Sequence, residues 1–473
     1  MQHHALIIPV TTHVSTLVVG AGISGLVCGY ALRKAGIDAH VIESSATPGG
    51  VIRSERRDGY LLEFGPQSFN ATSALLNLCR ELHIDDQLLP APANAPRYVL
   101  VKGTLRPVPL SPPAFIASSL FGPVTKLRVL RDILGRSAPP QNDESVAAFT
   151  RRKFSRELLD KLVGPFVSGI YAGDPEKLSL RSAFPQLYEA EKSAGSVIRG
   201  LLFSAKKRSV SAEKPTLQTF REGNETLIEA LAANLGANLR CGVNAQRIRL
   251  TTASRDSKTD TPTFEVPLID NSREELLTTN RLIIAIPTQQ AASLLRDVDP
   301  QFESALASIA YAPGAVVSLG YPKNAVRHAL DGFGFLVPRS SGLRILGTVW
   351  NSSLFPNRAP DGRVLLTSFI GGATDPDAVS LPESKIVSTV HRELASVLGI
   401  SQPPSFSHVY AWQCAIPQYN LGHSQHMNQL AQMRTKYQSI RLIGNYLRGP
   451  ALGACVEQAL TVAAEAITNE RVT

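Results

Sequence analysis

The sequence contains no long hydrophobic run. A transmembrane helix needs about 18 consecutive apolar residues, whereas stretches such as Leu282–Ile286 have only the length of a buried strand. This absence excludes a protein anchored by spanning helices. It leaves open a protein that binds a membrane at its surface.

Cysteine is also scarce. The 5 cysteines are odd in number, and they lie scattered at positions 28, 79, 241, 414 and 455 without a CxxC pair. This pattern disfavours a disulfide framework and a zinc site, so we predict no metal and a reducing compartment. The first 15 residues contain no Lys or Arg, which a secretory or transit leader would need, and we therefore expect a cytoplasmic protein.

Neither charged nor apolar residues are in excess. Hydrophobic residues make up 44% and charged residues 18% of the 473 residues. These proportions are typical of globular proteins and exclude a disordered, collagenous or coiled-coil chain. At about 100–200 residues per domain, the length predicts two to four domains or subdomains.

The positive charge is concentrated in one part of the chain. The whole chain carries 48 − 39 = +9, and residues 105–210 alone carry 17 − 9 = +8. The same part contains the apolar, proline-interrupted segment Val108–Pro123 and the basic cluster Lys206–Arg208. Two interpretations stay open: a solvated basic subdomain, or a face whose apolar loop enters a bilayer while basic side chains meet anionic head groups. A nucleic-acid partner is not expected, because no nucleic-acid-binding motif accompanies the charge.

The clearest local pattern is a glycine-rich turn near the N-terminus. The apolar run Ser15–Val19 leads into Gly20-Ala-Gly22-Ile-Ser-Gly25, a segment with helical spacing follows, and a second strand ends at Glu43. Gly20 permits a tight turn, Gly22 lets the backbone approach a pyrophosphate, and Gly25 allows close helix–strand packing. Glu43 can accept hydrogen bonds from ribose hydroxyls. The pattern predicts dinucleotide binding, with FAD and NAD both open at this point.

A second glycine pair favours FAD. Gly49-Gly50 follows Glu43 by six residues, and Gly59–Pro66 comes soon after. This continuation resembles the extended FAD signature of the amine-oxidase-type flavoproteins. In those proteins the chain passes under the adenosine half and then along the isoalloxazine ring, where small residues are needed.

Six further segments resemble the protoporphyrinogen/coproporphyrinogen oxidase family of the amine-oxidase-type flavoproteins. They are Pro96–Pro109, Leu162–Gly200, Gly347–Pro360, Thr367–Ala373, Ala415–His423 and Gly444–Leu460. The resemblance runs from about residue 15 to the C-terminus.

The resemblance implies a mixed α/β fold with p-hydroxybenzoate-hydroxylase-like topology. A Rossmann-like FAD-binding domain would be assembled from residues 1–90, 215–300 and 411–473. Residues 91–214 would form an inserted helical, basic, membrane-facing domain, and residues 301–410 an antiparallel-sheet substrate domain.

The activity implied by the resemblance is the FAD- and oxygen-dependent oxidation of protoporphyrinogen IX to protoporphyrin IX in haem biosynthesis. Six electrons would leave in three flavin cycles, and each cycle would produce hydrogen peroxide. Oxidation of coproporphyrinogen III stays open, as do another flavoenzyme of the superfamily and a non-catalytic FAD-binding protein. The implied partners are the porphyrinogen, dioxygen, an anionic membrane surface and a ferrochelatase that receives the product. We expect a monomer or homodimer.

The resemblance also assigns substrate-binding residues. Arg97 would bind a propionate, because a guanidinium holds a carboxylate bidentately. The apolar side chains of Leu336, Val349 and Phe369 would sandwich the macrocycle, and Gly173 would lie at the pocket floor. Gln67 departs from the family pattern, and the sequence leaves open whether it orients the substrate or only packs.

The remaining assignments concern the cofactor. No catalytic side chain is expected, because the flavin N5 atom accepts the hydride. The residues expected to contact FAD are Gly20, Gly22, Ile23, Ser24, Gly25, Glu43, Ser44, Gly49, Gly50, Val51, Ile52, Gly65, Pro66, Val243, Gly444, Asn445 and Val456.

Overall fold

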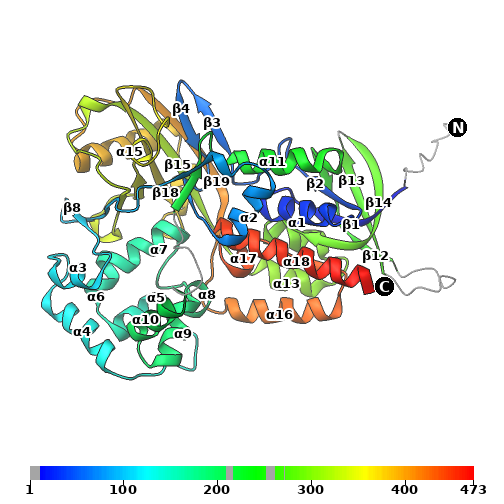
Figure 1. Ribbon diagram of the computed structural model, residues 1–473, viewed down its shortest axis with the longest axis horizontal. Coiled ribbons are helices and arrows are strands. Elements are labelled where there is room, and N and C mark those ends of the chain that lie inside the picture. Colours follow the sequence, from blue (N-terminus) through cyan, green and yellow to red (C-terminus); the bar gives the residue numbers. More distant parts are fainter. Residues whose placement is uncertain (1–10, 209–216, 252–261, 271, 473) are drawn as a thin grey trace.

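We analysed a computed structural model that describes residues 11–208, 217–251, 262–270 and 272–472. Two sheet-containing parts lie at opposite ends of the long axis, and a group of helices lies beside one of them (Figure 1). Among the described helices, none is both long enough and apolar enough to cross a membrane.

A large sheet near the two termini contains the glycine-rich turn that predicts dinucleotide binding, and we call it and its helices the dinucleotide-binding part (Figure 1). Its strand β1 pairs in parallel with β2 on one side and β14 on the other, and β14 also pairs with β20 and β13. The strands are β1 (Thr11–Val19), β2 (Ala39–Glu43), β10 (Leu239–Cys241), β11 (Val243–Ala245), β12 (Arg249–Thr251), β13 (Thr263–Asp270), β14 (Arg273–Ile284) and β20 (Ile440–Leu442).

Helices cover both faces of this sheet. The side chains of α1, α2, α11 and α18 share one apolar core with β1 and β2, while α12, α13 and α16 share a second core on the opposite face. These helices are α1 (Ile23–Lys34), α2 (Ser73–Glu81), α11 (Glu225–Leu235), α12 (Thr288–Leu295), α13 (Pro300–Ala307), α16 (His423–Lys436) and α18 (Leu452–Val472). The structure therefore confirms the βαβ unit predicted from the glycine spacing.

The second sheet has seven strands in the order β19-β15-β18-β17-β16-β7-β8. It is antiparallel except for the parallel pair of β16 and β7. The strands are β7 (Arg97–Val101), β8 (Thr104–Pro107), β15 (Tyr311–Pro322), β16 (Gly334–Leu336), β17 (Ile345–Val349), β18 (Arg363–Gly371) and β19 (Phe406–Pro417). Helix α15 (Glu383–Leu398) covers one face through a shared apolar core.

The predicted boundaries group residues 91–214 with the helices. In the structure, β7 pairs with β16 of the seven-stranded sheet and with β8 at its edge, and the first helix of the insert begins only at Pro112. The sheet also extends to Pro417, beyond the predicted limit at residue 410. Both differences arise because strand pairing joins segments that lie far apart in the sequence.

The insert is built from helices packed around a small apolar core that includes Phe121, Phe149 and Leu180. The helices are α3 (Pro112–Ala117), α4 (Pro123–Leu134), α5 (Val146–Lys153), α6 (Arg156–Leu158), α7 (Gly164–Tyr171), α8 (Leu180–Ala183), α9 (Pro185–Ala194) and α10 (Val197–Arg208). The basic cluster Lys206–Arg208 ends α10, and its side chains lie outside the described residues.

The remaining strands and α-helices are short. They are β3 (Ser54–Arg57), β4 (Tyr60–Glu63), β5 (Phe69–Asn70), β6 (Leu88–Pro90), β9 (Leu217–Phe220), α14 (Asn351–Leu354) and α17 (Asn445–Arg448). β3 and β4 form a hairpin, and β9 pairs with both β5 and β6.

Candidate functional site

The glycine-rich turn between β1 and α1 is tightly packed at Gly20 and Gly25 but has open space beside Gly22. Gly20 has φ +103°, and a Cβ atom there would lie 2.7 Å from Ala285 O. A Cβ on Gly25 would overlap Gly20 O, whereas a Cβ on Gly22 would meet nothing within 4 Å. Gly22 is also the N-cap of α1, and no side chain caps the helix there. The free N–H groups and the open backbone suit a pyrophosphate.

Glu43 closes one side of this turn. Its Oε2 accepts a hydrogen bond from Ala21 N at 2.8 Å, and its Oε1 accepts from Ser45 N at 2.9 Å and from Ser44 Oγ at 3.3 Å. Ser45 O in turn accepts from the N–H of Gly242, next to the buried Val243. The carboxylate is therefore held at the end of β2, next to the glycine turn, where a ribose would lie.

The second glycine pair lies directly against the first turn. Gly49 N donates to Ala21 O at 2.8 Å, and a Cβ on Gly50 would lie 3.5 Å from Gly22 Cα. A Cβ on Gly65 would overlap Val51 O, so this segment also needs glycine for close backbone packing. Residues predicted from separate motifs thus come together at the N-terminus of α1.

The C-terminal segment that begins at Gly444 also packs against the glycine-rich turn and α1. Gly444 has φ +147°, and its N–H donates to Gln458 Oε1 at 2.8 Å. Val456 is fully buried in the same apolar core as Ala21, against which Ile23 also packs, and Ser24 lies against the neighbouring Cys455. Asn445 O accepts a hydrogen bond from Tyr419 Oη.

A second cluster lies on one face of the seven-stranded sheet. Arg97 pairs with Gly334, which pairs with Val349, while Leu336 pairs with Gly347, which pairs with Phe369. Because residues two apart on a strand point to the same side, Arg97, Leu336, Val349 and Phe369 share one face. Val99, on this face, is buried among side chains of the helical insert.

Helix α7 covers this face. It packs against β16 and β17, and a Cβ on Gly169 of α7 would lie only 2.5 Å from Leu336 Cδ2, which is too close for a non-bonded contact. The helix ends in a tight turn in which Ala172 has φ +47° and its carbonyl accepts from Ala373 N at 2.7 Å. Gly173 follows in this turn and is buried.

Arg97 supplies a positive charge at the edge of this face. Its side chain is exposed, and its guanidinium carbon lies 5.4 Å from the centre of the Phe333 ring. Within the part of the chain that the structure describes, no carboxylate forms an ion pair with it. The guanidinium is thus available to a carboxylate from outside the chain.

Comparison with known proteins identifies the family. Residues 23–467 match the family model of flavin containing amine oxidoreductases. The chain belongs to this family.

Two curated relatives of this flavin-containing amine oxidoreductase act on porphyrinogens, by their names. The chain is 36% identical over 472 residues to the chloroplastic protoporphyrinogen oxidase of Nicotiana tabacum, covering 95% of this chain and 84% of that protein. It is 28% identical over 478 residues to the coproporphyrinogen III oxidase of Bacillus subtilis (strain 168), covering 96% and 97%. A crystal structure of a protein from Exiguobacterium sp. 255-15 has a TM-score of 0.78 at 22% identity, covering 97% and 99%. The family match confirms the predicted oxidoreductase class and flavin cofactor, and the solved structure supports the fold.

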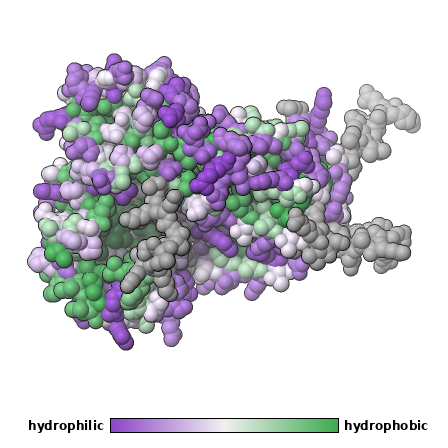
Figure 2. All heavy atoms as spheres, viewed as in Figure 1, coloured by the Kyte–Doolittle hydropathy of each residue, from purple (hydrophilic) through white to green (hydrophobic). Residues whose placement is uncertain are grey.

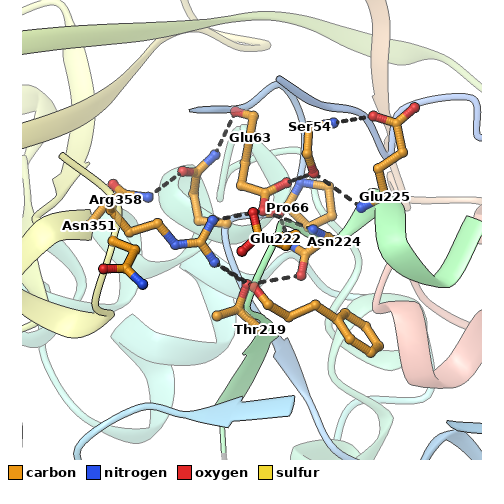
Figure 3. A network of polar contacts seen from close by, with 12 residues as sticks. Ser54, Glu63, Pro66, Thr219, Glu222, Asn224, Glu225, Asn351 and Arg358 are labelled. Atoms are coloured by element: carbon orange, nitrogen blue, oxygen red, sulfur yellow. Dashed lines mark hydrogen bonds and ion pairs between the residues drawn. The ribbon is translucent and has the colours of Figure 1, made fainter. Parts of the chain in front are cut away.

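Within this flavin-containing amine oxidoreductase, a buried polar network joins the β3–β4 hairpin to the segments that contain Asn224 and Arg358 (Figure 3). Glu63 of β4 forms an ion pair with Arg358 at 3.3 Å and accepts from Ser54 Oγ at 2.7 Å and Asn224 N at 2.9 Å. Arg358 also donates to Thr219 Oγ1 at 2.8 Å. Three segments that meet only in the folded chain are thereby fixed together.

The same network uses the polar groups of Gln67. Its Nε2 donates to Glu63 O and Gly65 O, both at 3.0 Å, and its Oε1 accepts from Asn351 Nδ2 at 2.7 Å. Asn224 Nδ2 donates to Pro66 O at 2.7 Å. Gln67 therefore helps to hold the Gly65–Pro66 turn, since both of its N–H donors are taken by the protein.

Burial raises the pKa of Glu63 to about 7, even though Arg358, Ser54 and Asn224 act in the opposite direction. The sequence analysis missed both Glu63 and Arg358. A signal for Glu63 did exist, because a carboxylate within the apolar strand β4 needs a partner when it is buried. Nothing in the sequence indicated that the partner would be Arg358, 295 positions later.

Proposed function

We propose that the chain is an FAD-dependent oxidase of protoporphyrinogen IX that uses dioxygen and releases hydrogen peroxide. The observation that carries the proposal is the single sheet face that combines Arg97 with Leu336, Val349 and Phe369 under α7. A macrocycle with propionate groups needs such an apolar face with one cation at its edge. Both named relatives support a porphyrinogen substrate.

In this reaction the residues of the chain bind and orient the cofactor and the substrate. When bound, FAD supplies the hydride acceptor. The glycine turns and Glu43 hold the cofactor, Arg97 anchors a propionate, and the apolar face together with α7 excludes water from the ring. The buried network around Glu63 fixes the position of the Gly65–Pro66 turn relative to the seven-stranded sheet.

Purified protein with bound FAD tests the proposal. We expect porphyrin fluorescence and hydrogen peroxide to appear with protoporphyrinogen IX, and less turnover with coproporphyrinogen III. Faster turnover of coproporphyrinogen III would assign the earlier substrate instead. Absence of turnover with both, despite full flavin content, would refute oxidase activity on porphyrinogens.

We also propose that the helical insert docks on an anionic membrane surface. Helix α4 carries exposed Val124, Leu127, Leu130 and Leu134 along one side, while its Asp132 points inward and is buried. Exposed apolar side chains also come from α3 and α10, and a hydrophobic patch gathers where these helices lie in Figure 1 (Figure 2). A helix with apolar residues outward and a charge inward favours an apolar environment outside.

Sedimentation with vesicles tests the docking surface. We expect binding to vesicles that contain anionic lipids, weakening as salt rises, because salt screens basic residues near the head groups. The double variant Leu127→Ser, Leu134→Ser should lose binding, whereas Ile269→Ser, which changes an exposed isoleucine on β13 of the dinucleotide-binding part, should keep it. Equal binding by both variants would refute this surface.

All five cysteines are free, which supports a reducing cytoplasmic location.

A further inference from the structure

Strand β8, at the edge of the seven-stranded sheet, carries a second exposed guanidinium group, that of Arg106. The strand pairs with β7 in antiparallel register, and Arg106 lies opposite Val99. Residues opposite each other on paired strands point to the same face, and so do residues two apart on one strand. Arg106 therefore shares the face of Val99 and Arg97.

The packing of the neighbouring side chains agrees with this assignment. Leu105 packs, together with Tyr98 and Leu100, against the apolar core that the sheet shares with α15. Val99 is buried instead in the apolar core of the helical insert. Because side chains alternate along a strand, Arg106 points away from the side of Leu105 and toward the side of the insert, where it is exposed.

The two guanidinium groups share this face without an anion from the chain. Arg97 precedes Val99 by two residues, which places Arg97 and Arg106 diagonally across the strand pair, about 7–8 Å apart. In the described part of the chain neither side chain forms an ion pair. Asp331 accepts a hydrogen bond from Tyr98 Oη at 3.2 Å, and Tyr98 belongs to the other face. Two like charges so placed repel each other, and a ligand with two anionic groups removes that repulsion.

We propose that Arg106 binds the second propionate of the porphyrinogen, next to the propionate that Arg97 anchors. This proposal rests on the porphyrinogen oxidation proposed above. Protoporphyrinogen IX carries its two propionates on neighbouring pyrrole rings, so both carboxylates leave the macrocycle on the same side. One guanidinium on each of two neighbouring strands matches this pair, and each can hold a carboxylate bidentately.

The pair of arginines also orients the macrocycle. Next to β7 the sheet continues with β16, β17 and β18. When both propionates lie at β7 and β8, the two rings that bear vinyl groups lie toward Leu336, Val349 and Phe369 of those strands. Coproporphyrinogen III has propionates in place of the vinyl groups, and these two carboxylates would lie toward apolar side chains. The arrangement thus favours protoporphyrinogen IX.

Three variants separate the charge of Arg106 from its position in the fold. Arg106→Ala removes the cation, and Arg106→Lys keeps the charge without the bidentate fork. The matched control is Arg249→Ala, because Arg249 is also an exposed arginine on a strand, but on β12 of the dinucleotide-binding part. Both positions are exposed, so the variants should fold and retain flavin.

Steady-state kinetics with protoporphyrinogen IX and with the two isomers of its monomethyl ester tests the proposal. We expect Arg106→Ala to raise KM for the diacid about tenfold, with kcat changed less than about threefold, because a charge-assisted contact is lost. Arg106→Lys should recover part of this loss, and Arg249→Ala should match wild type.

The esters identify the propionate that each arginine binds. With one monomethyl isomer, Arg106→Ala should change KM less than about twofold, because the carboxylate that Arg106 binds is already neutralised. Arg97→Ala should show the same insensitivity with the other isomer. Protoporphyrin retains both propionates, so its dissociation constant, measured by fluorescence titration without turnover, should also rise about tenfold in Arg106→Ala.

Four results would overturn the proposal. Unchanged KM and unchanged protoporphyrin binding in Arg106→Ala would show that the guanidinium is only solvated. An equal rise in KM with the diacid and both esters would show that Arg106 acts on the shape of the site. Weaker sedimentation of Arg106→Ala with anionic vesicles, at unchanged KM, would assign the guanidinium to lipid head groups. If wild-type protein with bound flavin neither oxidises a porphyrinogen nor binds protoporphyrin, the proposed function and this inference fail together, whereas wild-type turnover with an unaffected Arg106→Ala enzyme removes the inference alone.

Discussion

The dinucleotide-binding part and the helical insert arrange polar and apolar side chains in opposite ways. Around β1 the core is apolar, and Val18, Leu26 and Ile283 have no exposed surface. In the insert, Leu127 is 66% and Leu134 76% exposed. Charged groups lie inside the insert. The comparison shows that the dinucleotide-binding part buries its apolar side chains, whereas the insert exposes several leucines and buries charged groups.

Charges inside the insert are shared among several partners. Glu191 is fully buried and forms ion pairs with Arg152 at 2.8 Å and Lys153 at 3.3 Å, and Lys153 also pairs with Asp132 at 2.6 Å. Burial alone would raise the pKa of Glu191, but the hydrogen bonds from Arg152 and Ser137 outweigh it and lower the pKa. Glu63, with one cation beside it, has a raised pKa instead. At Glu63 burial outweighs the opposing hydrogen bonds and the charge of Arg358, whereas at Glu191 the hydrogen bonds and the charges of Arg152 and Lys153 outweigh burial.

Among the predicted changes in the insert, removing the Glu191 charge should lower the free energy of unfolding most. Glu191→Gln removes the carboxylate that Arg152 and Lys153 share, although Arg152 keeps its ion pair with Glu144 and Lys153 keeps its ion pair with Asp132. We therefore expect the free energy of unfolding to fall by about 3 kcal/mol, the lower end for a disrupted buried ion pair. Urea unfolding at pH 7 measures this loss. Glu189→Gln on the same helix is the control, because its side chain is 62% exposed, and it should change stability by less than about 0.5 kcal/mol. Equal effects would show that the buried cluster is not special.

Glu63 should give the opposite pH dependence to Glu191. Because the folded pKa of Glu63 is raised from 4.5 to about 7, the folded protein keeps a proton in that interval which the unfolded chain releases. Its contribution to stability is therefore fully present below pH 4.5 and is lost as the pH rises through 7. Relative to Glu63→Gln, the unfolding free energy of wild type should fall by about 3 kcal/mol between those pH values.

Urea unfolding of wild type and Glu63→Gln at several pH values measures that difference. The lowered pKa of Glu191 gives a contribution that is present above the unfolded pKa and is lost as the pH falls through the folded pKa. A constant difference between wild type and Glu63→Gln across pH 4.5–7 would contradict the raised pKa.

Arg97 differs from the buried charges of Glu191 and Glu63 because it has no carboxylate partner in the described part of the chain. Arg97→Ala should leave stability unchanged but raise KM for the porphyrinogen about 10- to 150-fold, the equivalent of about 1.5–3 kcal/mol. Arg97→Lys should recover part of this loss, since the ammonium lacks the bidentate fork. Steady-state kinetics of both variants, with the flavin content measured, tests this prediction. Arg80→Ala on α2 is the control, and an unaffected Arg97→Ala enzyme would place the propionate elsewhere.

Substitution of an exposed leucine of the insert should also change stability little. Leu127→Ser should alter the free energy of unfolding by less than about 0.5 kcal/mol, because the side chain buries little surface. Leu26→Ala, in the apolar core of the dinucleotide-binding part, should cost about 2–5 kcal/mol. Urea unfolding of the two variants measures the contrast. A large loss in Leu127→Ser would mean that the insert buries this leucine in solution.

Local spacing predicted the βαβ unit near the N-terminus correctly. Gly20, Gly22, Gly25 and Glu43 belong to one βαβ unit, so their order along the chain already implies their arrangement in space. The resemblance to the porphyrinogen oxidase family, carried by segments such as Pro96–Pro109, indicated Arg97 and the apolar residues of the substrate face. The roles of these residues in binding remain predictions.

Only the tertiary structure decided which distant residues meet. Glu63 finds Arg358, and Gln418 finds Tyr171, because separate segments pack together, and no periodicity within either segment specifies the other. Helix α4 has the apolar spacing of an ordinary amphipathic helix, and only its packing shows that the apolar side points outward. The amino-acid sequence determined the local units and their chemistry, whereas the folded chain determined the partners, because pairing energy depends on distances that a linear pattern does not contain.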